Sequence, residues 1–392
     1  MHPRSAPELS LLLDAIVPSR PAAVDPRTWD LRQWERGLAA AEWHRLSPVL
    51  FRHLGADDAP PAVRARLEES YLANVARNMF LRETIRGVFD TLHTAGVPAI
   101  PLKGAILIET VYRDPGLREM WDIDVLVPHD QLAAAERALA AIGFREDPRA
   151  SKREHLPRGL RAADHHEPAL VSTEGLTAVE LHHHVAIRGE GEAFDIGEFW
   201  TRARPASGFA LAPATDDLLL HLALHFTRNR LVGRTAGALA QLCDIVWLVN
   251  SLDVDWQRFV TSARSYSLAT RIFLALVAAA ELAACIPDDV LAELRPARLE
   301  QSIVDNFLRL RVLRADEHGT LRPLRRIVLP PRDRLAAGYH AGSNAWPSLA
   351  RAYVSRARGT TPQVLSAFKR PLLETIRDYR LSGQISTLEN RQ

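Results

Sequence analysis

Two aspartates, Asp122 and Asp124, stand at the start of an apolar, β-branched run that extends to Val127. Alternate side chains of a strand point to the same side, so the two carboxylates would share one face while Ile123 and Val125 face the other. Carboxylates on one face repel unless a cation lies between them, and Mg2+ is commonly held by one or two carboxylates together with substrate phosphates. The pair predicts a divalent metal site, although a turn or a solvated strand edge also fits an Asp-x-Asp.

Lys103 and Gly104 follow a short apolar run, 97–102, and open a helix-compatible stretch from Ala105 to Tyr112. Backbone amides at a helix N-terminus attract anions, and an ammonium beside them would add a charge. Arg118 lies just before the aspartate pair and offers a second cationic contact. These residues therefore predict phosphate binding next to the metal site.

A second strand-like run, Leu176–His182, carries a third carboxylate, Glu180. Glu180 could complete a metal triad with the two aspartates. Strand alternation would place His182 and His184 on the same side as Glu180. We expect His182 to line the cleft or to orient Glu180.

Two further histidines, His221 and His225, are four residues apart in a helix-compatible segment. This spacing could supply two ligands of a catalytic zinc site, which needs three protein ligands. Leu222 stands where the helical zinc signature has glutamate, so packing within the helix is the favoured interpretation.

Together these motifs resemble a family, the uncharacterised bacterial nucleotidyltransferases of the DNA polymerase β-like superfamily. The resemblance spans roughly residues 70–250, and Lys103-Gly104-Ala105 stands where the superfamily usually has Gly-Gly or Gly-Ser. Glu180 stands where the family often has aspartate. The segments that carry the resemblance are Leu102-Lys103-Gly104, Tyr112 to Arg118, Asp122 to Val127, Glu180-Leu181-His182, and the set His221, His225 and Asp244.

The resemblance implies transfer of a nucleotidyl group from an NTP such as ATP to an acceptor, which could be a peptide natural product, a sugar or another small molecule. It implies Mg2+ or Mn2+ as cofactor, held by Asp122, Asp124 and Glu180, which would also be the catalytic residues. Lys103, Gly104 and Arg118 would bind the nucleotide. The residues alone support metal-assisted phosphoryl or nucleotidyl transfer. Two alternatives remain open: a toxin-like enzyme that nucleotidylates transfer RNA, and a non-catalytic nucleotide-binding protein.

Amino-acid composition narrows the classes of protein to which the chain can belong. The 392 residues are 47% hydrophobic, and a net charge of +2 does not demand nucleic acid as a partner. The two cysteines, Cys243 and Cys285, exclude a disulfide framework and indicate a reducing, cytoplasmic location. We find no signal peptide, and Glu281 interrupts the most apolar stretch, Ile272–Ile286, which is too short to span a membrane.

A C-terminal basic segment is the one marked charge asymmetry. Such a surface is usually a solvated face, and as a functional surface it would bind a polyanion. Its basic residues are Arg322, Arg325, Arg326, Arg332, Arg334, Arg351, Arg356, Arg358, Lys369 and Arg370.

The elements that must position the candidate residues follow from periodicity. We expect an α+β fold: a small mixed β-sheet nucleotidyltransferase core with helices, embedded in a large, mostly α-helical chain. Residues 1–95 would be a helical region that ends in a long helix from Ala62 to Ala95, 96–210 the core, and 211–392 a second helical region. Residues 145–166 are expected to form a loop insertion.

Overall fold

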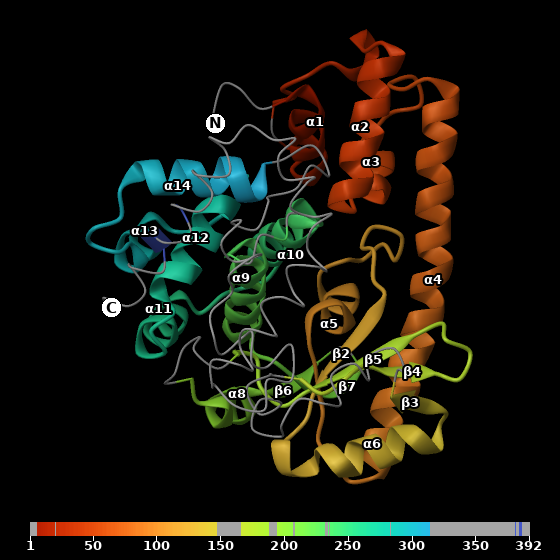
Figure 1. Ribbon diagram of the computed structural model, residues 1–392, viewed down its shortest axis with the longest axis vertical. Coiled ribbons are helices and arrows are strands. Elements are labelled where there is room, and N and C mark those ends of the chain that lie inside the picture. Colours follow the sequence, from red (N-terminus) through yellow and green to blue (C-terminus); the bar gives the residue numbers. More distant parts are fainter. Residues whose placement is uncertain are drawn as a thin grey trace, which may run out of the picture.

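The computed structural model describes residues 6–313, apart from 20, 147–165, 188–193, 207, 232–233, 235 and 283, together with residues 381, 384 and 385. It confirms the predicted α+β fold, in which many helices surround a small mixed sheet (Figure 1). The C-terminal basic segment and nearly all of the predicted 145–166 loop lie outside the described residues.

A five-stranded sheet with the order β1-β2-β5-β4-β3 forms the centre of the fold. β2 pairs antiparallel with β1 and parallel with β5, while β4 pairs antiparallel with both β5 and β3. A separate antiparallel pair, β6 and β7, lies next to β1. The strands are β1 (Ile100–Pro101), β2 (Asp122–Leu126), β3 (Phe144–Glu146), β4 (Leu170–Ser172), β5 (Ala178–His182), β6 (Arg204–Ala206) and β7 (Phe209–Ala212).

The N-terminal helices stand along one side of the molecule (Figure 1). They are α1 (Pro7–Ile16), α2 (Leu31–His44), α3 (Ser47–His53) and α4 (Pro61–Thr94), with a short 3-10 turn at Pro26–Thr28. The long α4 packs on α3 at one end and on α6 (Leu132–Ala141) at the other. Asp30 begins α2 with a capping box, in which its carboxylate accepts from the Gln33 amide and the Gln33 side chain accepts from the Asp30 amide.

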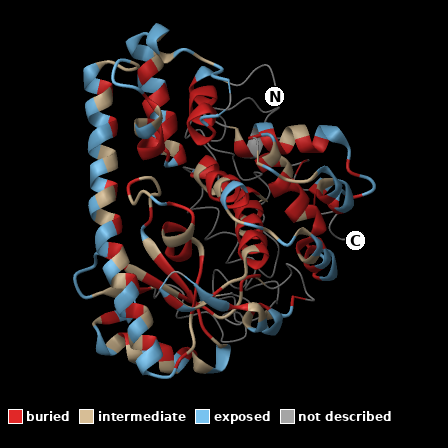
Figure 2. Ribbon diagram, turned by 180° about the vertical axis from the view of Figure 1, so that it is seen from behind, coloured by how far each residue is buried: buried red, intermediate tan, exposed pale blue. Residues whose placement is uncertain are grey.

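The buried face of α4 is partly polar. Helical periodicity places Phe80 on the apolar face, yet its side chain is exposed, whereas Asn74 and Asn78 are buried. Figure 2 shows most of α4 exposed or intermediate. The reason is that α4 packs through a narrow stripe and uses two amides of that stripe to hold a loop, as described below.

Among the helices after residue 195, α9, α10 and α12 are mostly buried, whereas the others bury one side only. α9 is buried along nearly its whole length (Figure 2) and packs on α10, α11 and α12. One continuous hydrophobic core runs from α1 to α14. The remaining helices are α5 (Lys103–Thr110), α8 (Ile196–Arg202), α9 (Thr215–Leu231), α10 (Ala238–Ser251), α11 (Trp256–Ser265), α12 (Ala269–Ala280), α13 (Asp288–Leu294) and α14 (Gln301–Phe307), with a 3-10 turn at His129–Gln131 and a π-turn at Leu308–Val312.

Among the described residues, no helix combines the length and the apolar character that a membrane crossing requires. Residues 272–280 of the apolar stretch belong to the buried helix α12.

Candidate active site

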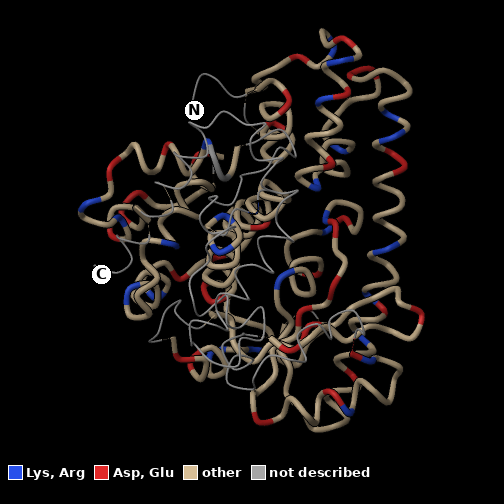
Figure 3. Tube along the Cα trace, viewed as in Figure 1, with Lys and Arg blue, Asp and Glu red and all other residues tan. Residues whose placement is uncertain are grey.

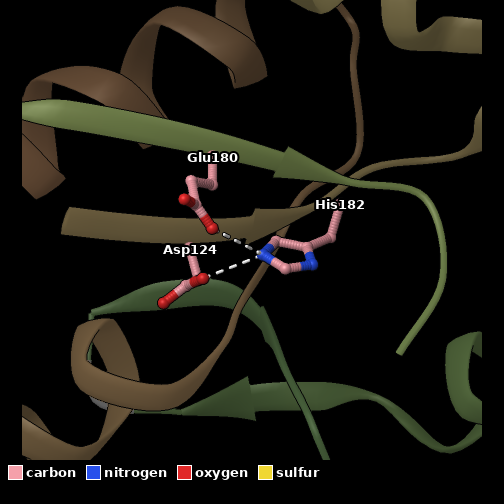
Figure 4. A group of neighbouring side chains, drawn as sticks. All are labelled: Asp124, Glu180 and His182. Atoms are coloured by element: carbon pink, nitrogen blue, oxygen red, sulfur yellow. Dashed lines mark hydrogen bonds and ion pairs between the residues drawn. The ribbon is translucent and has the colours of Figure 1, made fainter. Parts of the chain in front are cut away.

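The parallel pairing of β2 with β5 brings three candidate residues together. The register sets Asp124 beside Glu180 and Leu126 beside His182. Because residues two apart in a strand share a face, His182 lies on the same side as Glu180. His182 Nε2 lies 2.8 Å from Asp124 Oδ1 and 3.7 Å from Glu180 Oε2 (Figure 4). These three side chains offer donor atoms within 4.8 Å of one another, the one group of this kind found in the described chain.

Lys103, the first residue of α5, reaches the same carboxylate. Its Nζ donates to Asp124 Oδ1 at 2.6 Å, and the side chains of Lys103 and Asp124 are 13% and 3% exposed. Lys103 has a φ of 44°, in the left-handed region that non-glycine residues seldom adopt. The left-handed backbone of Lys103 therefore places its ammonium against the carboxylate cluster.

The pKa values of the two aspartates, Asp122 and Asp124, are shifted in opposite directions. Burial raises the pKa of Asp122 to about 6, and the neighbouring negative charges of Asp124 and Glu180 contribute to the increase. Burial also acts to raise the pKa of Asp124, but the Lys103 ammonium and the hydrogen bond from His182 hold it well below its ordinary value. Asp124 is therefore held in its anionic form, whereas burial, with a smaller contribution from neighbouring carboxylates, favours the protonated form of Asp122.

Arg118 forms a bidentate pair with Asp244 of α10. Nε and Nη2 donate to the two carboxylate oxygens at 2.9 Å each, and the Tyr112 hydroxyl donates to Asp244 Oδ1 at 2.7 Å. The third nitrogen, Nη1, lies beside Gly104, where an added Cβ would be 2.5 Å from it and 2.4 Å from Met120 Sδ. Gly104 is required for this close approach, and Arg118 keeps one nitrogen facing the start of α5.

The loop that carries Arg118 is held by α4. The Asn74 amide donates to the Gly116 carbonyl at 2.7 Å, and the Asn78 amide donates to the carbonyls of Pro115 and Arg118. An added Cβ at Gly116 would lie 2.2 Å from the Tyr71 ring. Sequence reasoning missed these positioning residues, although two asparagines four apart on the buried side of a helix are a signal that could have found them.

His225 and His221 lie outside the carboxylate cluster. His225 Nε2 accepts from the Asn229 and Gln241 amides at 3.1 and 3.0 Å, and burial, followed by the nearby Lys103 charge, lowers its pKa well below the ordinary value. His221 is fully buried within α9. The described structure therefore gives the pair no third zinc ligand, and it assigns the His225 ring to a hydrogen-bond network in the wall of a cavity.

That cavity, of about 490 Å³, extends from Asp122 and Asp124 to the N-terminal helices, and neither Glu180 nor the fully buried His182 is among its lining residues. Its volume is in the range of nucleotide-sized ligand sites. The predicted residues Lys103, Gly104, Arg118, Asp122 and Asp124 all line it. The cavity wall also contains Tyr112 of the family-like segment, together with polar residues that sequence reasoning did not identify, which are Arg45, Glu119, Asn229, Arg230, Arg234 and Gln241.

The chain is an α+β protein in which a parallel strand pair presents carboxylates beside the start of a helix. This arrangement is suited to phosphate chemistry. A model of the family described as uncharacterised nucleotidyltransferase matches residues 30–284 of the 392. The chain belongs to this nucleotidyltransferase family, as the sequence motifs indicated. Neither the curated proteins nor the solved structures gave a match to the chain.

Proposed function

We propose that the protein transfers a nucleotidyl group from an NTP to an oxygen of an acceptor. The observation that carries this proposal is the register of β2 and β5, which sets Asp124 beside Glu180 with Asp122 on the same face, at the edge of the cavity. Membership of the nucleotidyltransferase family supports the same reaction.

The donor set fits a divalent cation. Asp124, Glu180 and His182 offer two carboxylates and one imidazole at short mutual distances, and Asp122 adds a carboxylate whose pKa is raised by burial and, to a smaller extent, by the charges of Asp124 and Glu180. Carboxylates suit Mg2+ and Mn2+, and the imidazole adds affinity for Mn2+. When bound, such an ion neutralises charge on the triphosphate. The predicted ligands Asp122, Asp124 and Glu180 thus remain our proposal, with His182 added.

The chain's own groups supply binding and proton transfer. The Lys103 ammonium, the α5 amides at Gly104 and the Nη1 of Arg118 would contact the phosphates. The acceptor oxygen would attack the α-phosphorus in line while the bond to the bridging oxygen of the pyrophosphate breaks. Glu180, whose side chain is 26% exposed, would accept the proton of the acceptor.

Lys103 has two partners in this proposal. Before the donor binds, its ammonium neutralises Asp124 at 2.6 Å. A divalent cation at the carboxylates would replace that positive charge, which leaves the ammonium available for a phosphate oxygen. Lys103 would therefore act as a counter-ion in one state and as a phosphate ligand in the other.

The experiment is incubation of the full chain with each α-labelled NTP, Mg2+ or Mn2+ and an extract of the native host, followed by identification of the labelled molecule. Label transfer is expected for wild type and not for Asp124→Asn. Asp90→Asn, an exposed aspartate of α4, is the matched control and should label like wild type. Equal labelling by Asp124→Asn and wild type would refute the proposed site.

A further inference from the structure

A second wall of the cavity carries two arginines that the proposed reaction does not use. Arg45 ends α2, and Arg234 lies between α9 and α10. Both line the cavity that also contains Asp122 and Asp124. They come from segments remote from the carboxylate strands, so they form a separate feature of the same cavity.

The two arginines differ from the other cations of the cavity in their partners. Lys103 is paired with Asp124, and Arg118 is paired with Asp244. Within the described parts of the chain, the guanidinium groups of Arg45 and Arg234 form no hydrogen bond or ion pair. The acidic group that interacts most clearly with Arg45 is Glu119, whose pKa is raised by burial although the charges of Arg45 and Arg77 oppose the increase.

Arg45 adopts a backbone conformation that is costly for arginine. Its φ of 57° and ψ of 42° place it in the left-handed region at the C-cap of α2, a position where glycine is the usual residue. Of the three described non-glycine residues with positive φ, two are Arg45 and Lys103, both cations that line this cavity. Strain retained at a ligand-facing position is typical of functional sites.

The position of Arg45 is fixed by contacts between α2 and the start of α10. The Gly237 amide donates to the Trp43 carbonyl at 2.9 Å, and the Leu239 amide donates to His44 Nδ1 at 3.4 Å. The Arg45 side chain lies against Gly237, with its Cδ 3.7 Å from the place of an added Cβ. This packing places the Arg45 side chain against the segment that begins α10, three residues after Arg234, and both arginines line the cavity.

We infer that Arg45 and Arg234 form a second anion subsite, and that the subsite binds a phosphate group. Guanidinium groups hold phosphate through paired hydrogen bonds, and no described carboxylate lies within ion-pair distance of either arginine, although Glu119 interacts with Arg45 over a longer range. The inference rests on the proposed function only for the origin of that phosphate, which is either the terminal phosphates of the donor NTP or a phosphorylated acceptor.

Titration of the full chain with inorganic pyrophosphate in EDTA tests the subsite without metal and without turnover. Arg45→Gly and Arg234→Ala should each weaken pyrophosphate binding roughly threefold to tenfold, more at low salt than at high salt. Arg137→Ala removes an exposed arginine of α6 outside the cavity and is the matched control. Arg45→Gly should keep or raise the melting temperature because glycine suits the left-handed C-cap, so lost binding would not reflect unfolding.

The source of the phosphate is decided by two further titrations. If the donor supplies it, both variants weaken ATP binding but not AMP binding, and ATP prevents pyrophosphate from binding. If the acceptor supplies it, ATP affinity is unchanged, and pyrophosphate binds ATP-saturated wild type more tightly than it binds the ATP-saturated variants, by the same roughly threefold to tenfold. Pyrophosphate binding by both variants equal to that of wild type and Arg137→Ala would overturn the subsite. Label transfer that fails while pyrophosphate binding depends on these arginines would refute the proposed reaction alone.

Discussion

Two charged clusters lie in the wall of one cavity and differ in how completely their charges are matched. In the cluster of Arg118, Asp244 and Tyr112, each Asp244 oxygen accepts a hydrogen bond from the guanidinium. In the cluster of Asp122, Asp124 and Glu180, one ammonium and one imidazole face three carboxylates. The first cluster is complete without a ligand, whereas the second has an excess of negative charge that a cation would relieve.

Lys and Arg residues and Asp and Glu residues are interspersed along the described chain (Figure 3), so neither cluster reflects a general acidic or basic surface. The two clusters differ in charge balance because different elements meet in each of them. Asp244 comes from a helix that brings one carboxylate to one guanidinium, whereas β2 and β5 bring carboxylates to carboxylates. The comparison teaches that a predicted site residue such as Arg118 can have its charge neutralised within the fold and still leave one nitrogen for a ligand, whereas the carboxylates of β2 and β5 need a cation from outside the chain.

The largest expected effect concerns turnover at the carboxylate cluster. Asp122→Asn and Asp124→Asn should each lower kcat/KM by roughly 10³-fold or more, since charge stabilisation by a bound ion contributes several kcal/mol. Steady-state kinetics with the identified acceptor measures this. Near-wild-type rates from either variant would remove that carboxylate from the site.

The second effect concerns the contribution of the cluster of Arg118, Asp244 and Tyr112 to the stability of the fold. Asp244→Ala removes the partner of a guanidinium whose side chain is 17% exposed, and should lower the free energy of unfolding by about 3–5 kcal/mol. Urea denaturation in EDTA measures the loss, with Asp90→Asn as the control. A change below about 1 kcal/mol would mean that this cluster is not a structural pair.

The third effect concerns Lys103, whose ammonium donates to Asp124 in the carboxylate cluster. Lys103→Ala should cost roughly 1.5–3 kcal/mol in kcat/KM, the usual value of a charged hydrogen bond. Lys103→Gly should lose as much activity while relieving the backbone strain of the positive φ. Kinetics and melting temperatures of the two variants separate the charge from the strain, and a fully active Lys103→Gly would disprove the phosphate contact.

The smallest effect is the pH dependence that Asp122 confers on the metal-free protein. Its pKa rises from 3.8 in the unfolded chain to about 6 in the folded protein, so the folded state binds the proton more tightly. Stability is then lost as pH rises from about 4 to 6, by roughly 1–3 kcal/mol after allowance for partial exposure.

Asp122→Asn should abolish that loss, which makes the variant more stable than wild type above pH 6 and equal to it near pH 4. Melting temperatures in EDTA across this range provide the measurement. Added Mn2+ should reduce the difference by stabilising wild type. Parallel pH profiles for the two proteins would contradict the raised pKa.

Prediction from sequence succeeded where the signal is local. Helical periodicity predicted the long helix α4 to within a residue at each end, because the periodic run is long and Pro60 and Pro61 precede it. It missed the short elements β3, β6, β7, α8 and α13, whose few residues carry too little pattern. It also placed Phe80 on a buried face, because period alone does not say how wide the contact stripe is.

The sequence by itself determined that Asp122 and Asp124 share one face, since strand alternation is a property of the local backbone. Only the tertiary structure decided that Asp124 lies beside Glu180, that Arg118 meets a carboxylate 126 residues away, and that Arg45 faces the same cavity. The physical reason is that strand register and helix packing depend on contacts between distant segments, which no local pattern encodes.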